Sequence, residues 1–214
     1  MARKRGRPSK SEDQIDAKQK LLDAVVALIE KEGMEAVTVS NVLEESGLSN
    51  GTFYHHFKNI DDLMITIVKE LSFDTFPLIT PMEHLPERIC ELYDHLIDHY
   101  LRLGVKFMKR FYPTRNQGLA SYMCEEDGHF APGTAMARCE QEIRAAISAG
   151  ILSPETDAHE LSADICTIVK GCLFDWAMSD LTIDIRSNLS RIIHKFLDSF
   201  LVTVYPRRVQ NVQR

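Results

Sequence analysis

The sequence lacks several features that would define a membrane protein, a secreted protein or an enzyme. No run approaches the roughly eighteen consecutive apolar residues that a membrane-spanning helix needs. The basic N-terminus continues into Gly, Pro and Ser instead of an apolar segment, which predicts no secretory signal. Glycine-rich phosphate loops, nucleophile elbows and HExxH motifs are missing as well. We therefore expect a cytoplasmic protein that is not an enzyme and holds no cofactor or metal.

Cysteine is scarce, and its spacing is irregular. The 214 residues include Cys90, Cys124, Cys139, Cys166 and Cys172. An odd number without a regular pattern favours reduced thiols over a disulfide framework. Cys166 and Cys172 would lie about 240° apart around one helix, so they cannot jointly face one ligand from it. Core packing is the preferred interpretation, and a thiol or metal sensor is the alternative.

Acidic residues are absent from the first ten positions, although the chain carries a net charge of −6. Five basic residues stand there, so the rest of the chain carries −11. Within this arm, Arg5-Gly6-Arg7-Pro8 resembles an AT-hook, whose arginines enter a narrow A·T-rich minor groove. We predict minor-groove or phosphate contact by Arg5 and Arg7; the alternative is a solubilising basic tail.

Residues 38–63 have the pattern of two short helices and the start of a third. Gly47-Leu48-Ser49 separates the first two, which is typical of a helix-turn-helix. Ser49 can cap the second helix, and Asn59 with Asp62 can cap the third. In the second helix Phe53 and Phe57 share an inward face. The polar residues left on its outer side suit a helix that reads DNA.

The same stretch resembles the N-terminal module of the tetracycline-repressor (TetR) family. The resemblance is carried by Thr38-Val39, by residues 44–49 and 51–57, and by Asp61-Asp62-Leu63. Asn50 and His56 depart from the usual pattern on the DNA-facing side, so the operator sequence cannot be carried over. The DNA-binding residues that we predict, besides those of the arm, are Thr38, Ser49, Asn50, Gly51, Thr52, Tyr54, His55 and Lys58.

Helical patterns continue through most of the chain, and we predict an all-α fold. A first helix has Ser11 and Gln14 as a capping box and Ile15, Leu22, Val25, Val26 and Ile29 as its buried stripe. Further helices are expected over 59–71, from 87 to about 111, around 119–124, over 135–149, from 157 to about 179, and over 185–204. We expect a basic flexible arm (1–10), a helix-turn-helix DNA-binding domain (11–70) and a helical ligand-binding and dimerisation domain (71–214). A fourth helix is expected to join the three-helix DNA-binding unit to the larger domain.

The last two predicted helices are apolar over a wider arc than one surface helix needs. The resemblance implies a four-helix dimer interface there, which we expect to include Gly171, Phe174, Met178, Ile192, Phe196 and Phe200. A fully buried helix pair within a monomer is the alternative. A two-fold dimer would present two reading helices to a palindromic operator.

Aromatic and thioether side chains are concentrated in the middle helices, where regulators of this family hold ligands. The residues predicted to line the ligand pocket are Phe73, Phe76, Phe107, Met108, Phe111, Tyr122, Met136 and Phe174. Glu91, His95 and His99 share one helix face and could bind metal, but a solvated polar face is the preferred interpretation.

The expected function is that of a homodimeric repressor released from double-stranded DNA by a small apolar or aromatic effector. The alternative is the same architecture responding to a metal ion or to thiol oxidation.

Overall fold

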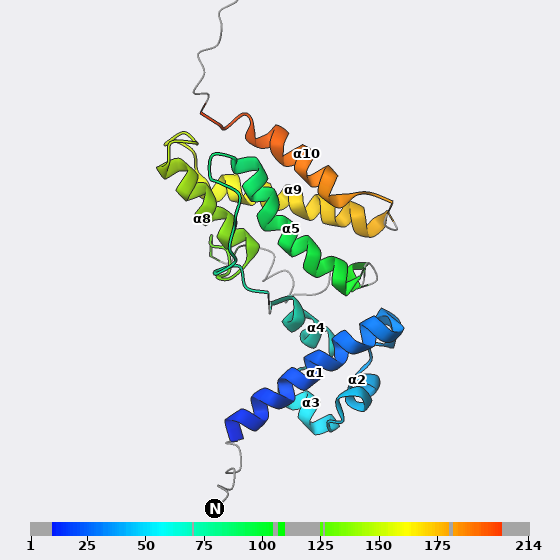
Figure 1. Cartoon of the computed structure of the whole chain (residues 1–214). Coiled ribbons are helices and arrows are strands. Elements are labelled where there is room, and N and C mark those ends of the chain that lie inside the picture. The colour runs from blue at the N-terminus through cyan, green and yellow to red at the C-terminus, as the bar shows by residue number, and fades with distance from the viewer. Residues whose placement is uncertain are drawn as a thin grey trace, which may run out of the picture. The chain divides into compact units, whose positions relative to one another are not determined.

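The computed structural model describes residues 10–69, 71–104, 107–109, 125, 127–179 and 182–202, with side chains from Asp16 onward. These residues form helices joined by turns, and the predicted all-α fold is confirmed (Figure 1). The chain divides into two compact units, one of residues 1–72 and 99–129 and one of residues 73–98 and 130–214. The break after Ser72 lies close to the boundary expected at 70, but the return of 99–129 to the first unit was not expected.

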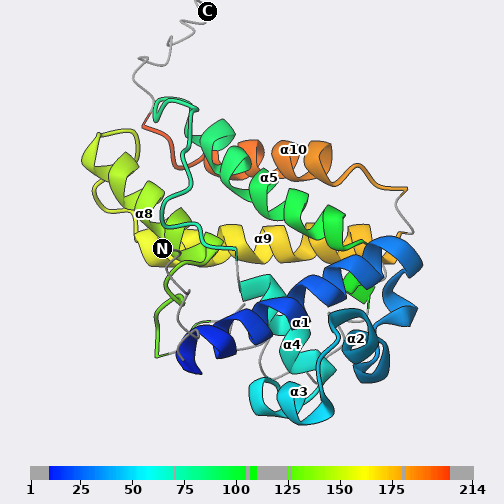
Figure 2. The same ribbon diagram turned by 60° about the horizontal axis from the view of Figure 1, so that its bottom comes forward.

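The first unit is built on α1 (Lys10–Glu32), which contacts α2 (Val39–Ser46), α3 (Asn50–His56) and α4 (Ile60–Lys69). Figure 2 shows α1 running across the other three helices. A 3-10 turn (Met34–Ala36) connects α1 to α2. The core face of α1 differs from the predicted stripe. Leu22 and Val25 are buried as expected, but Val26 is 37% exposed and Ile29 is half-buried, while Leu21 and Leu28 fill the core.

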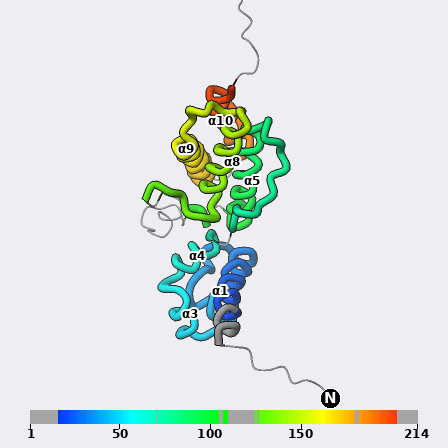
Figure 3. Tube along the Cα trace, turned by 90° about the vertical axis from the view of Figure 1, so that its left-hand side faces the viewer, coloured from blue at the N-terminus to red at the C-terminus, as the bar shows by residue number. Residues whose placement is uncertain are grey.

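The second unit contains most of α5 (Leu85–Leu103) together with α8 (Ala135–Ser148), α9 (Ala158–Met178) and α10 (Ile185–Leu197), which lie together in Figure 3. Helix α9 packs against both α8 and α10. Asp157 caps α9 as predicted, since its carboxylate accepts from the N–H groups of His159 and Glu160. Among the described helices, none is long and apolar enough to cross a membrane.

Two predicted helices end earlier than expected. The helix expected to reach about 111 stops at Leu103, because Gly104 takes a left-handed conformation with φ of 84°. The helix expected to reach 204 stops at Leu197. There the chain leaves the helix, Leu201 forms an isolated antiparallel bridge with Leu152, and the Val202 N–H donates to the Ile151 carbonyl at 2.9 Å. The short helix expected at 119–124 and the Ser11, Gln14 and Ile15 side chains lie outside the described residues.

Candidate DNA-binding surface, dimerisation surface and ligand pocket

The turn between α2 and α3 is fixed by local hydrogen bonds and one glycine. Thr38 caps α2, with its hydroxyl accepting from the Asn41 N–H at 3.2 Å. Gly47 ends α2 with φ of 68°, a left-handed conformation that costs a residue with a Cβ. Ser49 then caps α3 by accepting from the Thr52 N–H at 3.2 Å. The predicted helix-turn-helix is thus set by residues within the turn itself.

Helix α3 has one buried face and one solvent face. Phe53 is fully buried and Phe57 nearly so, and their ring centroids lie 5.9 Å apart. On the opposite side Tyr54 is 56% exposed although it is a large aromatic. Exposed around it are Ser49, Asn50, Gly51, His55 and Lys58, with Thr52 half-buried. The structure therefore presents most of the predicted reading residues to solvent together, while the two phenylalanines anchor the helix.

Gly51 is not required by the packing of this unit. A Cβ added there would lie 3.8 Å from the nearest atom, Ser49 Oγ, which is ordinary van der Waals contact. Its φ is not positive either. A glycine inside a helix costs about 1 kcal/mol relative to alanine, and nothing within the protein offsets that cost. Close approach of something outside the protein is the simplest physical reason for a glycine at this position.

The end of α3 is joined to α4 by a reciprocal cap. The Asn59 side-chain oxygen accepts from the Asp62 N–H at 2.8 Å, and the Asp62 carboxylate accepts from the Lys58 N–H at 2.9 Å. This cap holds the backbone of Lys58 while its side chain remains exposed. Nearby, burial lowers the pKa of His56, with His55 and Lys18 adding to the effect. Arg5 and Arg7 of the arm lie outside the described residues.

The outer face of α9 carries exposed apolar side chains. Phe174 is 52% exposed and Met178 is 59% exposed, and Gly171 stands on the same helix with no atom within 4 Å of an added Cβ. Phe196 on α10 and Phe200, which lies in the turn after the helix ends at Leu197, are half-buried with ring centroids 5.3 Å apart, and Ile192 is also half-buried. The inner face of α10 is filled instead by Ile185, Leu189, Ile193 and Leu197. The six predicted interface residues thus retain accessible surface that the protomer core does not use.

The residues predicted to line a ligand pocket lie in different environments. Phe73 is buried in the second unit beside Phe76 and His95, whereas Phe107 and Met108 are buried in the first unit. Met136 packs in a cluster with Phe130 and Cys166. Phe174 is exposed on α9, which suits the interface assignment better than the pocket assignment. Phe111 and Tyr122 lie outside the described residues, and the pocket stays a prediction.

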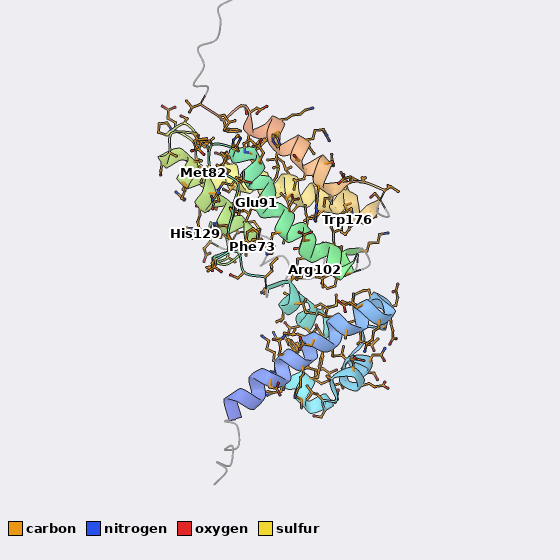
Figure 4. The ribbon with its side chains drawn as sticks, viewed as in Figure 1. Phe73, Met82, Glu91, Arg102, His129 and Trp176 are labelled. Carbon is orange, nitrogen blue, oxygen red and sulfur yellow. The ribbon has the colours of Figure 1, made fainter. Side chains whose placement is uncertain are left out.

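The Glu91, His95 and His99 face of α5 is neither a solvated surface nor an assembled metal site. The Glu91 carboxylate accepts from the N–H groups of Ile79 and Thr80, both at 2.8 Å. His95 stacks on Phe76 with ring centroids 4.0 Å apart. Figure 4 marks Phe73 and Glu91 in the second unit. Across the described residues, no group of three His, Cys, Asp or Glu side chains lies close enough to hold a metal ion.

The described thiols are poorly suited to ionisation. Burial raises the pKa of Cys139 to about 12 and that of Cys90 to about 11. Burial also raises the pKa of Cys172, and Cys166 is buried. Since the thiolate is the reactive form, these four positions do not favour the oxidation-responsive alternative. Cys124 lies outside the described residues.

A short capped helix with a buried aromatic face, an exposed polar face and a glycine turn before it defines a helix-turn-helix DNA-binding protein. Residues 21–67 match the family model "Bacterial regulatory proteins, tetR family", which covers the helix-turn-helix. Residues 21–67 are therefore identified with the DNA-binding module of tetR-family bacterial regulatory proteins. The resemblance carried by residues 38–63 is thereby confirmed.

Individual relatives match either a short stretch of sequence or the whole fold. An uncharacterised HTH-type transcriptional regulator of Bacillus subtilis, YvdT, is 29% identical over 80 residues, 37% of this chain and 41% of that protein. The fatty acid metabolism regulator protein of Bacillus subtilis is 36% identical over 50 residues, 23% of this chain and 26% of that protein. The chain therefore spans less than half the length of these curated relatives.

The solved structure of SmeT, the repressor of the Stenotrophomonas maltophilia multidrug efflux pump SmeDEF, covers the chain more completely. It has a TM-score of 0.58 at 20% identity and covers 90% of this chain and 94% of its own. At this identity the likeness concerns the fold. The shared fold includes the helices of the second unit as well as residues 21–67.

Proposed function

We propose that this regulator is a homodimeric cytoplasmic repressor that reads a palindromic operator through α3. The observation that carries the proposal is the exposed face of α3, which presents Gly51, Tyr54 and His55 to solvent. The buried Phe53 and Phe57 anchor the opposite face of the helix. Thr52 and Tyr54 would contact base edges, and His55 and Lys58 would hold phosphates. Gly51 would allow the helix backbone to approach the groove closely.

The proposed dimer interface is the outer face of α9 and α10. The exposed Phe174 and Met178 side chains and the edge formed by Phe196 and Phe200 would be buried against the same face of a second copy. Gly171 would let the two α9 helices approach each other. Such a dimer would place two α3 helices about 34–36 Å apart, as successive major grooves require.

The proposed signal is a small apolar or aromatic ligand held by the second unit. SmeT, which shares the fold, is known as a complex with triclosan, so the architecture is compatible with such a ligand. A ligand can release the operator only by binding one dimer shape more tightly than the other, and typical couplings are about 1–3 kcal/mol. Reciprocity then requires operator DNA to weaken ligand binding by the same factor.

Two measurements test this function. Mobility-shift assays with genomic fragments flanking the gene are expected to give a specific, salt-sensitive complex. A thermal-shift screen followed by calorimetry with and without operator identifies the effector, whose affinity must differ between the two titrations. Phe107→Ala or Met136→Ala, if these residues line the site, should spare DNA binding and blunt release. Absence of any specific DNA complex would overturn the proposal.

A further inference from the structure

The first unit contains a pocket of its own, of about 340 Å³. Its walls come from α1, from the end of α4 and the residues after it, and from the end of α5. The lining residues are Val26, Ile29, Glu30, Ile67, Leu71, His99, Arg102 and Leu103. All of them belong to the unit that contains the helix-turn-helix, and none is among the residues guessed for the ligand pocket.

The pocket explains why α1 departs from its predicted stripe. Val26 and Ile29 were expected in the core, but they lie half-exposed against this hollow. Together with Ile67, Leu71 and Leu103 they make its lining mainly apolar. Concave apolar sites of about 300–1,000 Å³ with few polar groups are typical of small-molecule binding. An apolar lining of this kind suits a ligand with a compact hydrophobic part.

The charge at the pocket is set by three helix ends. Glu30 lies in the last turn of α1, Ile67 in the last turn of α4 and Arg102 in the last turn of α5. Figure 4 marks Arg102 at the end of α5. Each helix C-terminus carries a partial negative charge of about half a unit, which favours cations. Arg102 complements the end of α5 itself.

Glu30 is exposed and places a full negative charge at the rim of the pocket, near the C-terminal end of α1, with Arg102 also in the lining. Among the described residues, no side chain forms a hydrogen bond or ion pair with its carboxylate. The neighbouring Lys31 is engaged with Glu45 at 2.5 Å. An exposed carboxylate near a helix C-terminus interacts unfavourably with the helix dipole, and a nearby cation relieves that interaction. A ligand with one positive charge would supply that compensation from inside the pocket.

We propose that this pocket is a second effector site, which takes a small apolar cation with its hydrophobic body on Val26, Ile29 and Leu71 and its charge on Glu30. The site touches α1 and α4, which flank the helix-turn-helix, and the last turn of α5, a helix that continues into the second unit. Its occupation would therefore change operator affinity from within the DNA-binding unit. That consequence rests on the proposed function, whereas the binding itself does not.

The test uses three probes of one shape and different charge: 1-naphthylmethylammonium, 1-naphthylmethanol and 1-naphthoate. Calorimetry with the full chain, without DNA, is expected to show the ammonium binding about tenfold more tightly than the alcohol, with naphthoate the weakest. Glu30→Gln should remove most of the preference for the cation and leave the affinity for the alcohol unchanged. Glu32→Gln, which removes a carboxylate from the same helix end outside the lining, should leave all three affinities unchanged.

Two further variants locate the site. Val26→Phe fills the hollow from a half-exposed position and should weaken all three probes, with circular dichroism confirming the helical content. Arg102→Gln should not weaken the ammonium. Tighter binding of naphthoate that is lost in Arg102→Gln, or cation binding unaffected by Glu30→Gln or Val26→Phe, would overturn the proposal. If the protein binds the cation through Glu30 but binds no DNA, the proposed function is overturned and the proposed second site is supported.

Discussion

The guanidinium of Arg88 on α5 donates to the carboxylate of Glu142 on α8 at 2.7 Å, and the two side chains are only 15% and 7% exposed. Arg138 donates to the other carboxylate oxygen at 2.8 Å. Both arginines also donate to carbonyls of the segment before α5. Arg138 reaches those of Phe73 and Asp74, and Arg88 reaches those of Leu78 and Thr80. One buried carboxylate thus organises two helices and the irregular chain that enters the second unit.

Replacing Glu142 with glutamine should destabilise the second unit strongly. The change keeps the shape of the side chain but leaves two largely buried guanidinium groups without their carboxylate. Removing one partner of a buried ion pair typically costs about 3–5 kcal/mol. Urea unfolding followed by circular dichroism measures the loss. Glu155→Gln, at an exposed position of the same unit, should change the free energy of unfolding by less than about 0.5 kcal/mol.

Tyr54→Ala and Lys58→Ala should weaken DNA binding in different ways. Loss of Tyr54 should cost about 1–3 kcal/mol on the true operator and little on random DNA, because base contacts carry the sequence information. Loss of Lys58 should weaken all sequences alike and reduce the salt slope by about one unit. Fluorescence anisotropy over a range of salt concentrations separates the two. Equal effects of both variants on operator and random DNA would rule out α3 as the reading helix.

Gly51→Ala should separate protein stability from DNA affinity. The added Cβ meets only Ser49 Oγ at 3.8 Å, so the free energy of unfolding should stay the same or rise by up to about 1 kcal/mol. In the proposed mode of binding the added methyl group would stand between the helix backbone and the DNA groove, so operator affinity should nevertheless fall. Thermal melting and mobility shifts on the same preparation measure both quantities. Undiminished operator affinity would show that α3 does not approach DNA at Gly51.

Gly171→Glu should convert the proposed dimer to a monomer without unfolding the protomer. The position is exposed in the protomer and open around its Cβ, so the helix can accept the larger side chain. Two copies of the new carboxylate would meet near the two-fold axis and lose their hydration without a partner. Sedimentation velocity measures the change, and operator affinity should fall with it. Ser148→Glu, on the exposed side of α8, should remain dimeric; an intact Gly171→Glu dimer would place the interface elsewhere.

The Cys139 thiol should resist alkylation in the native protein. With a pKa of about 12, only about one thiol in ten thousand is ionised at pH 8, and the thiolate is the form that reacts. Cys90, whose pKa is about 11, should also react slowly. Peptide-resolved mass spectrometry after iodoacetamide treatment, with and without urea, gives both rates. Rapid native labelling of these positions, accompanied by release from DNA under diamide, would favour the thiol-responsive alternative.

Local sequence was enough to predict the features whose partners lie within a few residues. The caps at Ser49, Asn59 and Asp157 each join a side chain to a backbone N–H two or three positions away, so no distant residue decides them. The inward face of α3 follows from the i,i+4 spacing of Phe53 and Phe57. Because these determinants are local, the helix-turn-helix and the all-α class could be predicted before any tertiary contact was known.

Only the tertiary structure decided features that depend on distant partners. The i,i+4 spacing on α8 is enough to predict an ion pair between Arg138 and Glu142. Arg88 lies 54 residues away from Glu142 in the sequence, so the pattern of α5 does not predict that Arg88 binds the same carboxylate. The last helix ends at Leu197 where Leu201 meets Leu152, a pairing that helical propensity does not contain. Val26 and Ile29 fit a core stripe by their spacing, yet they line a hollow because the end of α5 lies against it. A helical pattern fixes which residues share a face, whereas the neighbouring segments decide whether that face is filled or left open to a ligand.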